Sequence, residues 1–406
     1  MTTDYQLSHH PTIRLRNYMT FDFDTPVDRR GTESIKWRYY DPDVLPMWVA
    51  DMDFRSPEPI TRALRERAEH GVFGYAMTPP ELPAVICEWL EKRFHWTIDP
   101  QWLVCLPGIV AALNAVCRIA GEPGAGVLVQ TPVYPPFLGA PASNSRVLQS
   151  VELSLVKNDR IIEYEIDYDA FEAAITPQTR LFILCHPHNP IGRDYRPEEL
   201  QRLAEICLRH DVLICSDEIH CDLLLGDTRH TPTASLSSEI ADHCITLMAP
   251  SKTFNVPGLG FSFAVVPNRE LRKKLVAVSE GVLSPVTVMG YTGALAAYRE
   301  GGEWLDALRA YLTANRDAMA SYIVENMPHI ATTAPEATYL AWLDCRETKI
   351  EENPYTFFMR EAKVALGNGQ TFGQGGEGFV RLNFGCPQAQ LMEALERMRN
   401  ALGSIA

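Results

Sequence analysis

The chain has 406 residues, enough for two domains or one large α/β unit, and its composition (46% hydrophobic, 22% charged) is that of an ordinary globular protein. The formal net charge of −14 argues against nucleic acid or an anionic membrane surface as a main partner. No stretch approaches roughly 18 uninterrupted apolar residues, so we expect no membrane span. The N-terminus lacks the apolar segment of a secretory signal, and the ten cysteines are scattered singly. We therefore expect a cytoplasmic protein with reduced thiols.

Helix and strand signals alternate after an irregular first segment that is rich in Pro and Asp. We interpret residues 1–56 as an ordered arm with a single strand. Helices are predicted over residues 57–71, 82–96, 107–124 and 196–211. Apolar runs predict strands at residues 127–130, 146–153, 181–185, 212–216, 244–249 and 261–266. This alternation predicts a mostly parallel sheet covered by helices.

The pattern changes after residue 285. Long helices are predicted over residues 287–298 and 303–324, strands at 338–344 and 378–384, and a closing helix at 387–403. We expect the arm to contribute to a small domain, residues 57–285 to form a large domain, and residues 286–406 to form a C-terminal α+β domain. The glycine-rich segment 367–378 has no P-loop lysine and no following P-loop helix, so we interpret it as a flexible loop near Arg381.

Polar or aromatic side chains follow four consecutive strand candidates. They are Tyr134 after residues 127–130, Asn189 after 181–185, Asp217 and His220 after 212–216, and Ser251 and Lys252 after 244–249. Ligands of open parallel sheets bind at the carboxyl edges of the strands, so these positions predict one site.

The chemistry of this set fits pyridoxal phosphate. Lys252 can condense with an aldehyde, and Asp217 can hold the ring nitrogen protonated so that the ring accepts electrons. The Asn189 amide can donate to the phenolic oxygen of the ring, and Tyr134 can stack on its face.

The phosphate of such a cofactor needs donors at a helix start. Backbone N–H groups of Gly108, Ile109 and Val110 follow Pro107 at the start of a predicted helix, and the Ser251 hydroxyl can add a further donor.

These residues lie in segments that resemble a known family. "SDEIH", "PHNPIG", "TPVYPPF" and "APSKTFNVPGL" resemble the fold-type I (aspartate aminotransferase-like) pyridoxal-phosphate enzymes. "PMWVADMDF", "FGYAMTPP" and "SKTFNVPGLG" more narrowly resemble the MalY/PatB-type cystathionine β-lyases, which are carbon–sulfur lyases within the class I/II aminotransferase superfamily. The resemblance spans about Phe21 to Leu402. It implies an α/β fold of the PLP-dependent transferase type, with a mostly parallel seven-stranded sheet in the large domain and a smaller α+β domain.

The resemblance also implies residue roles. Lys252 would be the Schiff-base lysine, Asp217 the pyridinium partner, Asn189 the ligand of the phenolic oxygen and Tyr134 the stacking ring. Arg381 in "FVRLNFG" would bind the substrate α-carboxylate, with Asn189 beside it.

A further implied role belongs to Tyr75, which would reach the phosphate of the neighbouring subunit in a homodimer with shared sites. Three positions depart from relatives. Gly260 replaces a phosphate-binding Arg, His220 replaces the Tyr of aspartate aminotransferases, and His186 stands where Asn is common, a change without a physical account. His220 either contacts the ring oxygen or is a satisfied buried imidazole.

Two other pairs of polar residues have competing interpretations. His186 and His188 suggest a metal, but no third ligand is suitably spaced, so we expect no metal site. Asp51 and Asp53 resemble paired carboxylates, and capping of the arm is favoured over acid–base work.

The functional hypothesis is α,β-elimination of cystathionine or another S-substituted cysteine to pyruvate, ammonia and a thiol. The alternatives are a class I/II aminotransferase or a biosynthetic β- or γ-replacement enzyme, because these reactions share their first steps. A third hypothesis is a regulatory protein that binds a partner. No helix-turn-helix segment precedes residue 20 and the charge is acidic, which both oppose the DNA-binding form of that hypothesis.

Overall fold

The computed structural model describes residues 21–405. Residues 1–20 of the predicted arm, with the expectations of no secretory segment and no helix-turn-helix there, lie outside the described residues.

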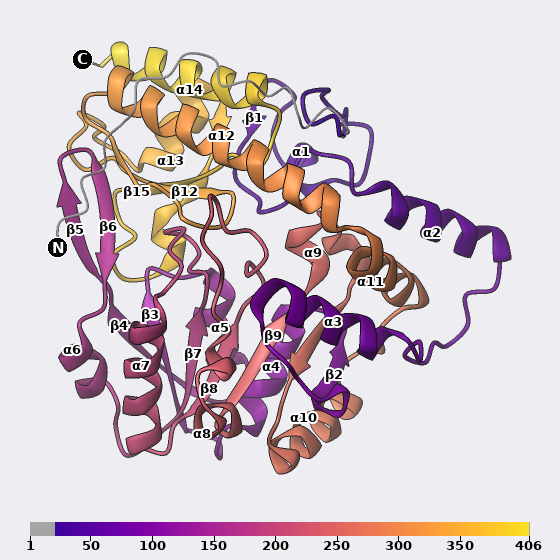
Figure 1. Cartoon of the computed structure of the whole chain (residues 1–406). Coiled ribbons are helices and arrows are strands. Elements are labelled where there is room, and N and C mark those ends of the chain that lie inside the picture. Colours follow the sequence, from indigo (N-terminus) through magenta and orange to yellow (C-terminus); the bar gives the residue numbers. More distant parts are fainter. Residues whose placement is uncertain (1–20, 406) are drawn as a thin grey trace.

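A seven-stranded sheet of order β2-β10-β9-β8-β7-β3-β4 forms the centre of the larger layer (Figure 1). Its strands are β2 (Leu103–Leu106), β3 (Gly126–Thr131), β4 (Val147–Glu152), β7 (Thr179–Cys185), β8 (Leu213–Asp217), β9 (Cys244–Met248) and β10 (Ser262–Val265). Only β10 runs antiparallel to its neighbours β9 and β2, and the other pairs are parallel. All six strands predicted for this sheet are present. The one strand of this sheet that the sequence prediction missed is β2, the short edge strand.

Helices cover both faces of this sheet, which explains why its central strands are apolar throughout. One face packs against α4 (Ile109–Ile119), α5 (Pro135–Ser143) and α10 (Arg269–Val282). The opposite face packs against helices that include α6 (Tyr168–Ala173), α7 (Pro197–Arg209) and α8 (Ser238–Asp242). Successive residues of β7 alternate between the two cores, with Phe182 in one and Ile183 in the other.

A second, six-stranded sheet has the order β14-β15-β12-β11-β6-β5. Its strands are β5 (Ser154–Asn158), β6 (Ile161–Glu165), β11 (Ala331–Thr332), β12 (Leu340–Asp344), β14 (Gly367–Asn368) and β15 (Phe379–Asn383). The hairpin β5–β6 therefore joins strands that follow it by more than 150 residues, through the pairing of Ile161 with Thr332. The boundaries of the predicted domains stay a prediction.

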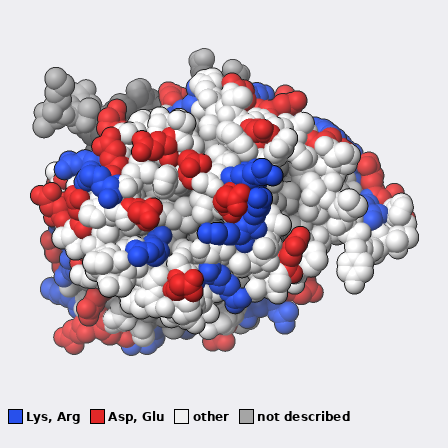
Figure 2. All heavy atoms as spheres, turned by 90° about the horizontal axis from the view of Figure 1, so that it is seen from below, with Lys and Arg blue, Asp and Glu red and all other residues white. Residues whose placement is uncertain are grey.

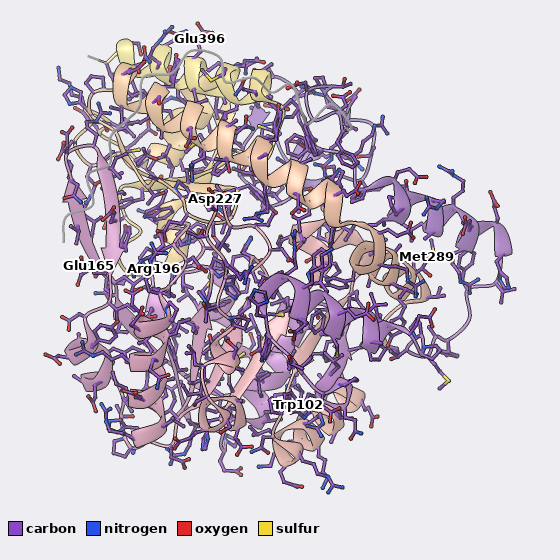
Figure 3. All side chains as sticks on the ribbon, viewed as in Figure 1. Trp102, Glu165, Arg196, Asp227, Met289 and Glu396 are labelled. Atoms are coloured by element: carbon purple, nitrogen blue, oxygen red, sulfur yellow. The ribbon has the colours of Figure 1, made fainter. Side chains whose placement is uncertain are left out.

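C-terminal helices and the arm surround this second sheet. The helices are α12 (Gly302–Asn326), α13 (Pro354–Phe357) and α14 (Gln388–Gly403), whereas α11 (Val288–Glu300) packs against α2 (Glu58–His70) and α3 (Leu82–Phe94). The arm adds α1 (Ile35–Arg38) and β1 (Leu45–Pro46), and β1 pairs with β13 (Val364–Ala365). In Figure 1 strands β12 and β15 of the second sheet lie above the seven-stranded sheet, and Figure 3 shows Glu396 on α14 at the top and Trp102, just before β2, in the lower part.

Helix α2 (Glu58–His70) and its connection to α3 (Leu82–Phe94) project from the body of the molecule (Figure 1). Helix α2 ends at Gly71, whose φ of 77° is the left-handed conformation that favours glycine. Across residues 21–405, none of the helices combines the length and the apolar character that crossing a bilayer requires. The ten cysteines are free thiols, of which Cys87 and Cys105 are half-buried and the others buried.

Candidate cofactor and substrate site

Neighbouring parallel strands bring the predicted polar residues to one edge of the large sheet. Asp217 ends β8, and its register partners are Cys185 at the end of β7 and Leu247 near the end of β9. The backbone N–H of His186 donates to the Asp217 carbonyl over 2.9 Å, which fixes the point where both strands end. The loops that follow these strands therefore start side by side, as the sequence predicted.

Lys252 lies in the short helix α9 (Pro250–Thr253), directly after β9. Its Nζ atom donates a 2.6 Å hydrogen bond to the carbonyl oxygen of Ala50 in the arm. Burial lowers the pKa of Lys252 to about 8, with Asp51 and Asp217 acting against this shift and Arg381 adding to it. A lysine with this pKa has a large neutral fraction at mildly alkaline pH, as a nucleophile or base requires.

Asp217 is buried, and the one hydrogen bond that its carboxylate accepts from the described residues comes from the Ile219 backbone N–H at 3.1 Å. Burial raises the pKa of this carboxyl to about 7, and the adjacent Glu218 adds to the shift, while Lys252 opposes it. A buried carboxylate with little hydrogen bonding is matched to a cationic partner, such as a protonated ring nitrogen.

Arg381 lies on β15 of the second sheet and reaches the same site. Its Nη1 donates to Oδ1 of Asn189 at 2.9 Å, and its Nη2 donates to the Trp48 carbonyl at 2.7 Å. The guanidinium carbon lies 5.0 Å from the ring centre of Phe372, and the buried Nε has no hydrogen-bond partner among the described residues. Burial lowers the pKa of Arg381 to about 10, so the side chain is a cation at neutral pH.

The glycine-rich segment near Arg381 is ordered, and the expectation of a flexible loop was wrong. Gly367 of β14 pairs with Arg381, and a 3₁₀ turn covers Gly369–Phe372. A Cβ atom at Gly369 would lie 2.2 Å from the carbonyl oxygen of Gly376. Only glycine therefore allows the backbone at residues 369 and 376 to approach so closely. The loop is thereby held with Phe372 against the guanidinium.

Asn189 and Tyr134 are joined through the backbone, because the Tyr134 N–H donates to the Asn189 carbonyl at 3.1 Å. Asn189 is buried, whereas the Tyr134 ring is half-buried at the start of α5. Burial raises the pKa of the Tyr134 phenol, so it stays protonated at neutral pH. The structure thus places both near Arg381 and Asp217, the charged groups that also act on Tyr134.

His220 is buried, and its Nδ1 has no hydrogen-bond partner in the part of the chain that the structure describes. Its ring lies 6.1 Å from that of Tyr339. Burial lowers the pKa of His220 well below its usual value, and the charges of Lys252 and Arg381 act in the same direction. A neutral imidazole with a buried open nitrogen is not satisfied by the protein alone, which favours contact with a bound group over the alternative of a satisfied histidine.

The predicted phosphate donors lie at the start of α4 and in α9. Gly108 caps α4, with Ile109 buried and Val110 exposed at the first two helical positions. Ser251 is half-buried next to Lys252. Gly260, which replaces an arginine of relatives, has a φ of 65°, and a Cβ there would lie 3.3 Å from the Pro107 carbonyl. An arginine at this position would be strained.

Tyr75 is not brought into this group of residues. Its side chain is fully exposed in the segment that projects between α2 and α3, together with Val72, Phe73 and Met77. In Figure 2 the projection at the right-hand side is mostly white, whereas charged side chains of both signs are interspersed over the rest of the face seen from below.

The structure supplies an account of His186. Its Nε2 lies 3.1 Å from the Thr231 carbonyl, and its ring centre lies 4.3 Å from that of His230. His230 in turn lies between two buried carboxylates, with Nε2 2.8 Å from Glu218 and Nδ1 3.1 Å from Asp194. The sequence analysis missed His230, because it lies 44 residues from His186 and no local pattern in the sequence indicates that the two rings meet.

This cluster includes three groups that could hold a metal ion, namely His186, Asp194 and His230. Both ring nitrogens of His230 are already engaged with carboxylates, which raise its pKa to about 9 although burial acts to lower it. A protonated imidazole between two carboxylates has no free lone pair for a metal. We therefore interpret the cluster as a buried ion-pair network that includes Glu218, the residue next to Asp217.

Comparisons with known proteins identify the family. Residues 42–398 match the family model described as aminotransferase class I and II. Cystathionine beta-lyase PatB of Bacillus subtilis (strain 168) is 41% identical over 389 residues, which cover 94% of this chain and 100% of that protein. The chain belongs to the class I and II aminotransferase family, in its MalY/PatB-type group.

Solved structures agree with this family assignment. Cystalysin from Treponema denticola, which contains a pyridoxal 5'-phosphate cofactor, superposes with a TM-score of 0.91 at 32% identity, covering 96% of this chain and 100% of cystalysin. The PLP-bound C-S lyase from Staphylococcus hominis gives a TM-score of 0.87 at 33% identity over 94% and 99% of the two chains. Another structure of that lyase holds the inhibitor L-cycloserine. The predicted fold and family are confirmed.

The arm segment 48–54 contributes contacts that the sequence analysis did not assign. Asn255 donates to the carbonyls of Met52 and Phe54, and its Oδ1 accepts from the Met52 N–H. Asn383 donates to the Val49 and Asp51 carbonyls. Both asparagines lie in segments quoted for the resemblance, "SKTFNVPGLG" and "FVRLNFG", but their partners are some 200 to 330 residues away.

Proposed function

We propose that this chain is a pyridoxal-phosphate-dependent carbon–sulfur β-lyase that converts S-substituted cysteines, such as cystathionine, to pyruvate, ammonia and a thiol. The observation that carries the proposal is that Lys252 directly follows β9, which pairs with the end of β8 at Asp217, and that the charges of Asp217 and Arg381 both act on its amine. The names of the PatB and Staphylococcus hominis relatives support cleavage of a C–S bond.

Pyridoxal phosphate is the cofactor of this site, and the residues present fit it. Among residues 21–405 the Nδ1 of His220 and the Nε of Arg381 are buried without hydrogen-bond partners, and the Asp217 carboxylate accepts one hydrogen bond, from the Ile219 N–H. When bound, the cofactor supplies an electron sink for the electrons of a broken Cα–H bond. Lys252 would hold its aldehyde, Asp217 its ring nitrogen, Asn189 its phenolic oxygen and Tyr134 its ring face.

The protein's own groups account for the order of events. Arg381 binds the α-carboxylate of the substrate and exchanges its bond to the Trp48 carbonyl for it. Once the substrate amino group takes its place on the aldehyde, Lys252 would be a free neutral amine that can take the Cα proton, a step that a positioned base accelerates by roughly 10²–10⁴-fold. The thiolate then leaves from Cβ, and water completes the release of pyruvate and ammonia.

The test is incubation of the purified protein with an S-substituted cysteine in the absence of any keto acid. Pyruvate and thiol released in equal amounts over many turnovers support the lyase. Product formation only after a keto acid is added supports the aminotransferase alternative. Product formation only after a second nucleophile is added supports the replacement alternative. Turnover too slow to measure, with tight retention of another protein, supports the regulatory alternative.

The assembly that we propose is a homodimer with shared sites. A projecting segment with exposed Val72, Phe73, Tyr75 and Met77 is unusual for a monomer, since large apolar side chains exposed together mark interaction surfaces. A second copy of the chain would cover this segment and bring Tyr75 to the partner's cofactor phosphate. The free thiols support a cytoplasmic location.

A further inference from the structure

We propose that Asp51 is a positioning residue whose carboxylate is the counter-charge of the Lys252 amine, whereas its neighbour Asp53 only holds the arm. The inference rests on the proposed role of Lys252 as the catalytic amine. The observation behind it is that Asp51 and Asp53, whose carboxylates lie near the same cations, differ in the hydrogen bonds that their carboxylate oxygens accept.

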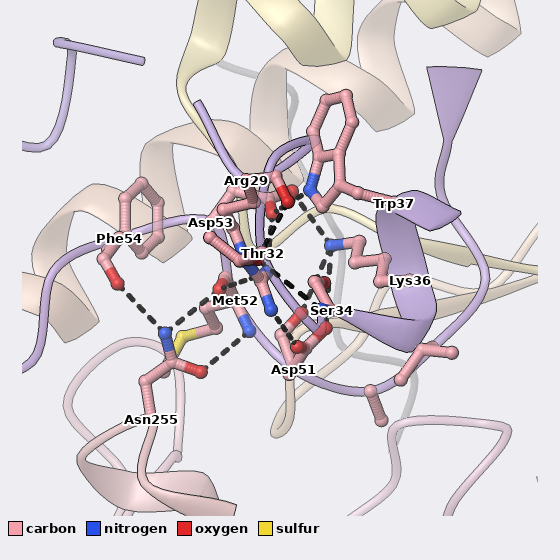
Figure 4. Close-up of polar contacts among 12 residues, drawn as sticks. Arg29, Thr32, Ser34, Lys36, Trp37, Asp51, Met52, Asp53, Phe54 and Asn255 are labelled. Carbon is pink, nitrogen blue, oxygen red and sulfur yellow. Dashed lines mark hydrogen bonds and ion pairs between the residues drawn. The ribbon is translucent and has the colours of Figure 1, made fainter. Parts of the chain in front are cut away.

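Asp53 is fully engaged in holding the arm (Figure 4). Its Oδ1 accepts hydrogen bonds from Arg29 Nη1 and Trp37 Nε1, both at 2.8 Å. Its Oδ2 accepts from Lys36 Nζ at 2.8 Å and from Gln390 Nε2 at 3.0 Å. This buried carboxylate therefore has no free oxygen for another group, and its role is the capping that the sequence analysis favoured for both residues.

Asp51 is only half engaged. Its Oδ2 accepts from Arg29 Nη2 at 2.5 Å, which anchors the carboxylate. Among residues 21–405 its Oδ1 is buried without a hydrogen-bond partner, and Lys36 Nζ lies 3.9 Å from it. A buried carboxylate oxygen left open costs free energy, so its retention beside a reactive lysine favours a role in the site.

The backbone holds Asp51 close to Lys252. The Ala50 carbonyl accepts hydrogen bonds from Lys252 Nζ at 2.6 Å and from the Tyr339 hydroxyl at 2.8 Å. The next carbonyl, that of Asp51, accepts from Lys36 Nζ at 3.1 Å and Asn383 Nδ2 at 2.8 Å. Within residues 21–405 no direct ion pair joins Lys252 to Asp51, so the carboxylate acts through its field.

The charged groups that face Lys252 are Asp51 and Asp217, which raise its pKa, and Arg381, which lowers it; the neighbouring His220 is neutral. Asp51 is the residue next to Ala50, whose carbonyl accepts the hydrogen bond of Lys252. With cofactor bound, Asp217 pairs with the ring nitrogen and Arg381 with the substrate carboxylate. Asp51 is then the charge left to stabilise the ammonium that Lys252 becomes after it accepts the Cα proton.

The test measures the proton affinity of Lys252 directly in the full chain before cofactor is added. The rate at which an amine-reactive anhydride labels Lys252 is followed by mass spectrometry as a function of pH, because only the neutral amine reacts. Asp51→Asn should move the labelling midpoint to lower pH and speed labelling several-fold below it, while Asp53→Asn should leave the midpoint in place. Asp51→Glu should restore the parental midpoint.

An unchanged midpoint in Asp51→Asn, or an equal shift in Asp53→Asn, would overturn the proposal. If Asp51→Asn does not fold, Arg29→Gln provides the opposite sign, because it strips the cation from Asp51 and should move the midpoint to higher pH. No such shift would also overturn the proposal. Labelling does not depend on lyase activity, so a shift without pyruvate release would refute the proposed function and leave the role of Asp51 standing.

Discussion

Arg381 and Asn189 face each other across the site from different sheets, with Arg381 Nη1 2.9 Å from Asn189 Oδ1. Arg381 belongs to β15 of the second sheet, and Asn189 follows β7 of the first. A substrate carboxylate bound between them would be held by both halves of the chain. The relationship makes Arg381 the residue whose loss should be felt in substrate binding.

We expect Arg381→Lys to lower kcat/KM by about 10–100-fold, because a lysine cannot reproduce the planar, two-pronged contact with a carboxylate. The matched control is Arg346→Lys, since Arg346 makes a similar two-pronged contact with Asp344 but its side chain is half exposed. Steady-state kinetics with the amino acid and with its methyl ester separate the causes. An equal loss for acid and ester would contradict carboxylate binding by Arg381.

Asp217→Asn should retain cofactor but lose turnover by at least about 10²-fold, because an amide carries no charge to hold the ring nitrogen protonated. Asp222→Asn is the control. Asp222 is also buried and follows β8, but its carboxylate accepts hydrogen bonds from Trp89 and Thr253. Cofactor content by absorbance and initial rates measure both variants. Full activity in Asp217→Asn would refute its assigned role.

Tyr75→Ala and Lys252→Ala should each be inactive, yet co-expression should restore roughly a quarter of the parental activity if sites are shared in a symmetric dimer. Half of randomly paired dimers are then mixed, and each mixed dimer has one site with both intact residues. Analytical ultracentrifugation gives the oligomeric state. A dimer without any recovery in the mixture would show that Tyr75 serves the site of its own chain.

The stability of the chain should depend on pH through His230. Its folded pKa of about 9 lies above its ordinary value of 6.5, so its contribution is full below about pH 6.5 and is lost as the pH rises toward 9. His230→Gln should lower the free energy of unfolding by about 3–5 kcal/mol at pH 6, because two buried carboxylates lose their cation. The difference between parent and variant should shrink as the pH rises.

Urea unfolding at several pH values measures this difference. His210→Gln is the control, because the His210 ring also lies 2.8 Å from a glutamate, Glu172, but on the surface. Such an exposed pair contributes little to stability, because water and salt screen it. Equal effects of the two substitutions would contradict a stabilising role of burial in the His230 network.

The sequence predicted the large sheet and the residues that gather at its carboxyl edge, because both depend on local patterns. Apolar runs identify buried strands, and the residues after them must lie at the carboxyl edge once the strands are parallel. Lys252, Asp217 and Asn189 are each defined by such a strand end. The register of Asp217 with Cys185 and Leu247 confirms that the strand ends meet.

Features that depend on distant pairing could not be predicted. The hairpin β5–β6 shows no local sign that it joins β11. The role of His186 becomes evident only from the contact of its ring with that of His230. Asp51 and Asp53 look alike in the sequence, and only their different hydrogen bonds separate them. Periodicity reports how a segment is buried, and it does not report which remote segment buries it.

The most direct measurement for the whole account is reductive trapping of the purified protein with borohydride, followed by peptide mass spectrometry. We predict that a pyridoxyl phosphate group is found on the peptide that contains Lys252, and that Lys252→Ala acquires no label and releases no pyruvate from S-substituted cysteine. A label on a different lysine, or pyruvate release by Lys252→Ala, would contradict the account.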